Sequence, residues 1–257
     1  MDCPIVGRVG SRRSARVVVL DVTRSECCPV LKGSQILSWP VIDDAVALDG
    51  RPLGKRGIET RRRLLEATSE QLESSGLRDL RVVEIAREVG TSPATFYQYF
   101  RDVEEAVLVL AEEVGEQSAP LGQLLARPWD GDDGLALARE LVDGFLTYWD
   151  HHRAILRTRN LAAQEGDQRF RDVRNAALQP LTEALATKVE HSGAEGLTPF
   201  AAAAALVAMI ERMAAFHTDL EVYGVSRSDV VETTARIVAT TTSGAGETVA
   251  GSEARRP

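Results

Sequence analysis

The chain has 257 residues, of which 44% are hydrophobic, and this is enough for a sizeable buried core. Its formal net charge of -8 argues against a protein that coats nucleic acid without sequence preference. The alanine-rich run from Phe200 to Ile210 stops at Glu211, short of the about 18 apolar residues that a membrane span needs, so we expect a cytoplasmic protein without one.

Residues 1–54 show no helical period and hold all three cysteines, Cys3, Cys27 and Cys28. An odd number of cysteines, two of them adjacent, indicates neither a disulfide framework nor a metal site. No long apolar core marks a secretory signal. We expect an extension outside the folded core, in which residues 1–45 are either a disordered arm or a stretch upstream of the natural start, with Val41 or Val46 as that start.

Residues 58–75 predict an amphipathic helix that ends at Gly76. Its inner stripe consists of Ile58, Leu64, Leu65, Ala67, Thr68 and Leu72. Lys55, Arg56 and the arginines at 61–63 make its N-terminal part basic. Such a cluster suits contacts with DNA phosphates, although a solvated helix face would have the same composition.

Residues 82–101, VVEIAREVGTSPATFYQYFR, predict two short helices joined by a tight turn. Ala86 is small where the helices would cross, and Gly90 suits the positive φ of the turn. Ser92 is a candidate N-cap with Pro93 at the first helical position, so a new helix begins there. A unit of this kind places its second helix in the DNA major groove, although helical proteins of other functions also contain such pairs.

Residues 55–114 resemble the DNA-binding domain of the TetR family of bacterial transcription regulators. The resemblance is carried by the runs IETRRRLLEATSEQLESSG, IAREVGTSPATFYQYF and EEAVLVLAEEV. Two positions depart from the family pattern: Arg81 replaces a capping Thr or Ser, and Val103 replaces a Lys that clamps phosphate. We therefore expect Asp79 to cap the second helix, and Arg81 and Arg101 to supply phosphate contacts.

Several residues of the second helix match family positions that meet DNA, among them Thr95 and Tyr97. Gln98 can form two hydrogen bonds with adenine, and Ala94 can contact a thymine methyl group. The charge distribution supports a DNA-binding role for residues 55–101. These residues carry 9 Lys and Arg against 7 Asp and Glu, whereas residues 102–257 carry 14 Lys and Arg against 25 Asp and Glu. The predicted DNA-contacting residues are Arg61, Arg62, Arg81, Ser92, Pro93, Ala94, Thr95, Tyr97, Gln98 and Arg101.

The rest of the chain predicts a helical bundle, so the fold class is all-α: a helix-turn-helix domain at 55–102, then a bundle at 103–243. Breaks are expected at Pro120, at 127–134 and, inside a long helix, at Pro180, with Asp133 as the N-cap of a helix. Residues 244–257 are polar and expected to be disordered. The predicted helices cover residues 103–117, 135–150, a continuation through 145–157, 168–189, 199–223 and 226–241.

The resemblance implies that the bundle dimerises and senses a small molecule. Alanines in 199–223 give a smooth surface for close helix approach, although they could instead pack within one subunit. The predicted dimer residues are Ala201, Ala204, Ala205, Ala208, Val230, Ile237 and Val238. Aromatic, Met and His residues suit an adaptable apolar pocket, although the same stripe also suits a core. The predicted ligand residues are Phe145, Tyr148, Trp149, His152, Leu156, Met209, Met213, Phe216 and His217.

Three functions remain open at this point. The first is a homodimeric repressor that leaves a palindromic DNA operator when a small hydrophobic effector binds. The second is a regulator of the same fold that has no ligand control or that activates. The third is an all-helical bundle enzyme, which is disfavoured because the Glu-x-x-His pairs of di-iron bundles are missing, so no catalytic residue, metal or cofactor is predicted.

Overall fold

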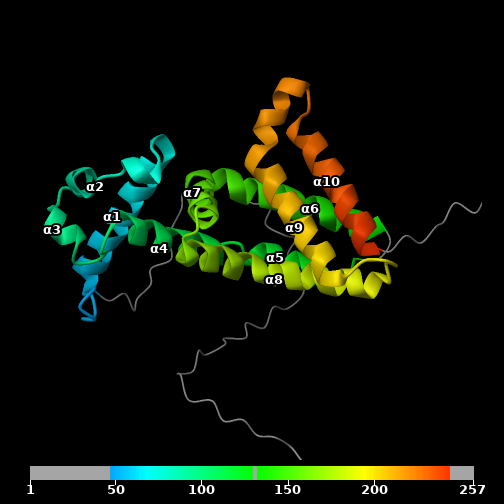
Figure 1. Ribbon diagram of the computed structural model, residues 1–257, viewed down its shortest axis with the longest axis horizontal. Coiled ribbons are helices and arrows are strands. Elements are labelled where there is room, and N and C mark those ends of the chain that lie inside the picture. The colour runs from blue at the N-terminus through cyan, green and yellow to red at the C-terminus, as the bar shows by residue number, and fades with distance from the viewer. Residues whose placement is uncertain (1–46, 130–131, 244–257) are drawn as a thin grey trace, which may run out of the picture. The chain divides into compact units, whose positions relative to one another are not determined.

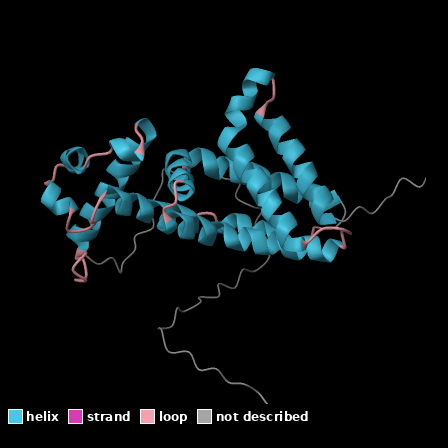
Figure 2. Cartoon of the chain, viewed as in Figure 1, coloured by secondary structure: helices cyan, strands magenta, loops and turns pink. Residues whose placement is uncertain are grey.

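The computed structural model describes residues 47–129 and 132–243. The regular elements of this part of the chain are helices, with no strand (Figure 1, Figure 2), which confirms the all-α prediction. The expectations for residues 1–45, for the three cysteines and for residues 244–257 lie outside the described residues. The fold is built from α1 (Lys55–Ser74), η1 (Leu77–Asp79), α2 (Val82–Val89), α3 (Pro93–Phe96), α4 (Val103–Glu116), α5 (Ala119–Leu125), α6 (Asp132–His151), α7 (Arg153–Gln164), α8 (Gln168–Ser192), α9 (Pro199–Phe216), η2 (His217–Tyr223) and α10 (Arg227–Ser243).

Helices α1, α2 and α3 form the small helix-turn-helix unit that the sequence predicts around the tight turn, which we name the reading unit (Figure 1). Five of the six residues predicted for the inner stripe of α1 are buried, from Leu64 to Leu72. Gly90 has a φ of 73°, a left-handed conformation that glycine adopts without steric cost, and its N–H closes α2. The side chain of Ser92 accepts a hydrogen bond from the N–H of Thr95, so α3 begins as expected.

The start of α2 differs from the prediction. No side chain caps this helix, and Asp79 lies in η1 rather than at the N-cap position. Arg81 occupies the N-cap, and its Nη1 donates to the carbonyls of Arg78 at 2.7 Å and Leu80 at 3.0 Å. The guanidinium thus stabilises the turn before α2. It leaves the first N–H groups of the helix without a side-chain acceptor.

Helix α4 begins where Asp102 accepts a hydrogen bond from the N–H of Glu105 at 2.7 Å. Glu104 and Glu105 lie in its first turn, where negative charge stabilises a helix N-terminus. The helix contacts α1 in the reading unit and then α7 and α8 in the bundle. Helix α4 therefore packs both against α1 of the reading unit and against helices of the bundle.

One predicted break in the bundle is displaced, one is wrong, and a predicted cap is displaced. The break expected at Pro120 lies at residues 117–118, between α4 and α5. Pro120 lies in the first turn of α5, where its missing N–H costs nothing. Pro180 lies inside α8, which runs unbroken for 25 residues because tertiary packing outweighs one lost backbone hydrogen bond. Asp133 falls within the first turn of α6, since that helix begins at Asp132.

Helices α6, α8, α9 and α10 form the body of the bundle, in which α9 and α10 contact each other and each contacts both α6 and α8 (Figure 1). The run Pro199–Tyr223, made of α9 and η2, is by length and composition apolar enough to cross a membrane, and its most apolar 18-residue window has a mean hydropathy of 1.5. It is longer than the stretch considered from sequence because Glu211 and Arg212 do not interrupt the helix. A helix that packs into a bundle along one side accounts for the same composition, and here 33% of the most apolar window is buried.

Candidate functional site

The exposed end of the reading unit is formed by α3 and the turn after it. Ser92, Ala94, Tyr97 and Gln98 are exposed there, whereas Thr95 is half-buried. Tyr97 is 52% exposed, and its ring meets the buried Phe96 edge-on at 5.8 Å between centroids. The phenol is thus held by the core of the unit while its face and hydroxyl remain open to a partner.

Arg61 lies differently from expectation, because its side chain turns into the α1–α4 contact. Only 18% of the side chain is exposed, its Nη1 lies 3.8 Å from Oε1 of Glu113, and its guanidinium stands over the Phe100 ring at 5.4 Å. A half-buried cation with these partners stabilises the joint between the two helices. In this position the Arg61 guanidinium serves the α1–α4 contact instead of a DNA phosphate.

Two other predicted phosphate ligands, Arg62 and Arg101, are paired with carboxylates. Arg62 donates to Glu59 at 2.7 Å and also pairs with Glu66, and the hydrogen bond that Glu59 accepts raises the pKa of Arg62. Arg101, with a side chain that is 77% exposed, pairs with Glu105 at 3.1 Å. Since exposed pairs contribute little, phosphate can replace these carboxylates at small cost.

Residues 47–54 also meet the reading unit, which sequence analysis missed. The N–H of Leu48 donates to the carbonyl of Gln98 at 3.0 Å, and Gly50, with a φ of 80°, turns the loop. Together with residues 97–99 this loop encloses a groove of about 480 Å³. The only sequence signal was the Gly-rich, Pro-containing stretch itself, because a loop of irregular backbone has no periodicity to detect.

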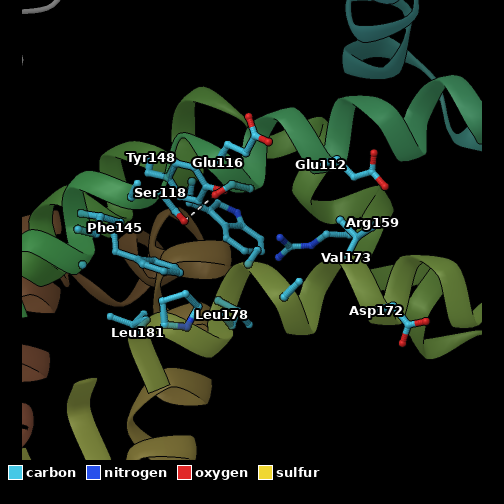
Figure 3. Close-up of a pocket in the computed structure, with 18 residues that line it drawn as sticks. Glu112, Glu116, Ser118, Phe145, Tyr148, Arg159, Asp172, Val173, Leu178 and Leu181 are labelled. Carbon is cyan, nitrogen blue, oxygen red and sulfur yellow. Dashed lines mark hydrogen bonds between the residues drawn. The ribbon is translucent and has the colours of Figure 1, made fainter. Parts of the chain in front are cut away.

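A larger cavity of about 660 Å³ lies in the bundle (Figure 3). Its walls come from the C-terminal part of α4, from α5 and α6, and from the middle of α8, with one residue from α7. Phe145, Tyr148 and Trp149 line it, as predicted from sequence. The Tyr148 hydroxyl donates to the carbonyl of Val114 at 3.1 Å, and burial raises the pKa of Tyr148 to about 12, so the phenol stays neutral.

The remaining predicted ligand residues do not line this cavity. Phe216 lies, together with Trp149, on a second cleft of about 800 Å³ that also holds several arginines. Leu156 is fully buried in the core, and His217 is buried against Asp150 at 2.9 Å. His152 is buried, and Met209 and Met213 pack against the core as partly buried residues. The aromatic and Met stripe is therefore mostly core, which was the open alternative.

Sequence analysis missed the polar group of the cavity wall, Arg159. Its side chain is 2% exposed and pairs with Glu211 at 3.2 Å, while Asn160 donates to the same carboxylate oxygen at 3.1 Å. Arg174 also pairs with Glu211. Burial lowers the pKa of Arg159, and the charge of Glu211 opposes that shift. A buried arginine has no pattern of its own in sequence, because exposed arginines on helices are far more common.

His152 makes stability depend on pH. Burial lowers its pKa from 6.5 to about 4, so between these values the unfolded chain binds a proton that the folded protein does not. Neutral His152 thus contributes to the free energy of unfolding above pH 6.5, and this contribution is lost as the pH falls towards 4. It amounts to about 2 kcal/mol after allowance for partial solvent access. Urea unfolding of wild type and His152→Leu at several pH values measures it. The variant is expected to show the flatter pH profile, and parallel profiles would contradict the assignment.

The residues predicted for a dimer interface divide into two groups. Ala201, Ala204, Ala205 and Ala208 are exposed along one face of α9, and Ile237 on α10 is 45% exposed. Val230 and Val238 are instead buried at 3% and 0% exposure within the subunit. These two valines cannot reach a second copy, because they point to the side of α10 that packs on the bundle.

Family models match both parts of the chain. Residues 64–107 match the model for bacterial regulatory proteins of the tetR family, and residues 121–248 match the model for the tetracyclin repressor-like C-terminal domain. Together these matches span more than half of the sequence. The chain belongs to the TetR family. It is therefore a DNA-binding transcriptional regulator and not an enzyme.

Solved TetR-family structures share the fold of this regulator. A TetR-family regulator from Streptomyces coelicolor matches with a TM-score of 0.53 at 14% identity, covering 72% of this chain and 79% of the other. One from Rhodococcus sp. gives 0.52 at 17% identity, with coverages of 72% and 99%. A third, from Mesorhizobium loti, gives 0.51 at 20% identity, with 74% and 96%. At such identities the likeness extends to the arrangement of helices.

Proposed function

We propose that this TetR-family regulator is a cytoplasmic, homodimeric repressor that leaves a palindromic operator when a small hydrophobic effector enters the bundle cavity. The observation that carries the proposal is the position of α4, which contributes to the reading unit at one end and to the cavity wall at the other. A molecule in the cavity thus contacts the element that holds the reading helix.

The contacts of α4 support this coupling. Val103, Ala106, Val107 and Leu110 are buried along its length. Glu113, near the cavity end, meets Arg61 of α1, and Glu112, Gly115 and Glu116 of the same turn line the cavity. An effector that shifts this end of α4 relative to α8 must also change the α1–α4 contact, because a helix moves as a rigid body.

The exposed alanine face of α9 supports the dimer. It is apolar at Ala201, Ala205 and Ala208, and small residues let a second helix approach closely. Arg212 continues the same face and covers the ring of Phe216 at 3.6 Å. A twofold pair of reading units would place two α3 helices on the half-sites of a palindrome, which is how a weak single-site reader gains affinity.

We assign direct DNA contact to the exposed residues of α3 and its following turn. Tyr97→Ala is expected to weaken operator binding by at least about tenfold, because the exposed phenol is lost while the buried Phe96 remains. Fluorescence anisotropy with a duplex selected from a random pool measures it, and sedimentation velocity checks that the variant keeps the wild-type oligomeric state.

The matched control is Tyr223→Ala, which removes an exposed tyrosine, 80% exposed, far from α3 in sequence. Operator affinity of this control should equal that of wild type. Equal affinity of Tyr97→Ala and wild type would remove Tyr97 from the DNA interface.

A reporter gene placed behind the selected operator tests the proposed repressor role. Expression that rises on deletion of the regulator supports repression, and expression that falls supports activation.

A further inference from the structure

We propose that the effector of the bundle cavity is an amphipathic monoanion, a carboxylate with an apolar body, and that Arg159 binds its charged end. This inference rests on the proposed sensing role of the cavity and adds the chemical class of the molecule sensed.

The shape and lining of the cavity set the apolar part of the ligand. A volume of about 660 Å³ lies in the range of sites for small organic molecules. Phe145, Trp149, Val173 and Leu181 provide apolar wall on two sides (Figure 3). A ligand body made of aliphatic or aromatic carbon fills such a space favourably, because each apolar surface removed from water makes the free energy of binding more favourable.

Within the described part of the chain, Arg159 is the one cationic residue that lines the cavity. Its Nε donates to the side-chain carbonyl of Asn160 at 3.0 Å and its Nη2 to Glu211 at 3.2 Å. Among the described residues its Nη1 has no hydrogen-bond partner. Figure 3 shows the guanidinium extending from α7 towards the middle of the cavity, between the aromatic wall and Val173. A donor is therefore aimed at any ligand in the apolar space.

The charge around this donor does not balance. Arg159 and Arg174 share a single acidic partner, Glu211, so the cluster carries one excess positive charge. Arg174 is 33% exposed and solvated, but Arg159, at 2% exposure, shares the Glu211 carboxylate with it, so an incoming anion compensates a buried guanidinium that Glu211 neutralises only in part. A carboxylate gains most, because it accepts a charge-assisted hydrogen bond from Nη1.

The acidic residues of the cavity rim do not reverse this preference. Glu112, Glu116 and Asp172 are exposed, and their carboxylates point away from the middle of the cavity (Figure 3). Water screens charges at such positions far more than it screens a buried guanidinium. A cation at the centre would lie against Arg159 without a carboxylate beside it.

Calorimetric titration of the full chain with three ten-carbon probes tests the proposal. The probes are decanoate, 1-decanol and decylammonium, which have an anionic, a neutral and a cationic head group. Decanoate is expected to bind at least about tenfold more tightly than decanol, and decylammonium more weakly than either. Equal affinities, or tighter binding of the amine, would overturn the proposal, as would failure of all three to bind.

Two variants assign the effect. Arg159→Met should abolish the preference for decanoate and leave decanol binding unchanged, because Glu211 keeps Arg174 and Asn160 as partners. Unchanged decanol affinity also shows that the variant is folded. Arg157→Met, an exposed arginine of the same helix that does not line this cavity, should behave as wild type. A preference that survives in Arg159→Met would place the anion elsewhere.

A third variant tests the location of the tail. A Cβ at Gly122 would meet no atom within 4 Å, and Gly122 lines the cavity, so Gly122→Leu should weaken binding of all three probes alike. Operator binding by the ligand-free protein is measured in parallel. If decanoate fails to bind, but ligand-free protein binds its operator and decylammonium or decanol binds and releases it, the ligand class is wrong and the proposed regulator stands. If the protein selects no operator, the proposed function fails by itself.

Discussion

Replacing Phe96 by Ala is expected to lower the free energy of unfolding by about 3 to 5 kcal/mol. Phe96 has 0% exposure and packs against Phe100 with ring centroids 5.3 Å apart. It lies at the end of α3, where it is the buried residue of a helix with only four members. A cavity here removes the contact that holds the reading helix on the unit, so operator affinity should fall as well.

Urea unfolding followed by circular dichroism measures the loss, and Tyr97→Ala serves as its neighbour control. Tyr97 is next in sequence but 52% exposed, so its removal should change the free energy of unfolding by less than about 1 kcal/mol. The two variants thus separate an effect on stability from an effect on DNA contact. Phe96→Ala should lower both the free energy of unfolding and operator affinity, whereas Tyr97→Ala should lower mainly operator affinity. A cost below about 1 kcal/mol for Phe96→Ala would contradict the packing described for α3.

Introducing a charge on the exposed face of α9 is expected to have the largest effect on DNA binding. Ala205→Glu places a carboxylate on the proposed dimer interface, where burial without a partner is costly. The subunits should separate, and operator affinity should fall by at least about a hundredfold, because each monomer then holds a single half-site. Sedimentation velocity and operator anisotropy on the same sample measure both changes.

Ala136→Glu is the matched control for that experiment. Ala136 is also an exposed alanine within a long helix, on α6 instead of α9. The control should keep the oligomeric state and operator affinity of wild type, and both variants should keep the helical circular dichroism signal. A dimer that persists in Ala205→Glu would place the interface on another face.

The reading unit could be predicted almost residue by residue because its determinants are local. Gly90 needs a positive φ, Ser92 caps the helix after it, and buried residues recur at helical spacing, so each signal lies within a few residues of the element that it defines. The position of Arg61 could not be predicted in this way. Its inward turn depends on Glu113 and Phe100, residues of later elements with which it forms the α1–α4 contact.

The bundle was predicted less well because tertiary packing decided it. Local rules placed breaks at Pro120 and Pro180, but one proline begins a helix and the other is carried within α8. The cavity was found only on its aromatic side. Its charged group, Arg159, depends on a pairing with Glu211 across 52 residues of sequence, and no periodicity reveals a contact at that separation.

Pro180 makes helix α8 easier to bend at one point of the cavity wall. In a regular helix the N–H of residue 180 would bond to the carbonyl of Ala176, and proline has no N–H to donate. Both residues line the cavity, so α8 can open at this place without breaking a hydrogen bond. For the proposed anionic effector, we therefore expect a cavity that accepts apolar bodies of differing width but selects for the charged end. The expected ligands are a set of related acids with differing bodies.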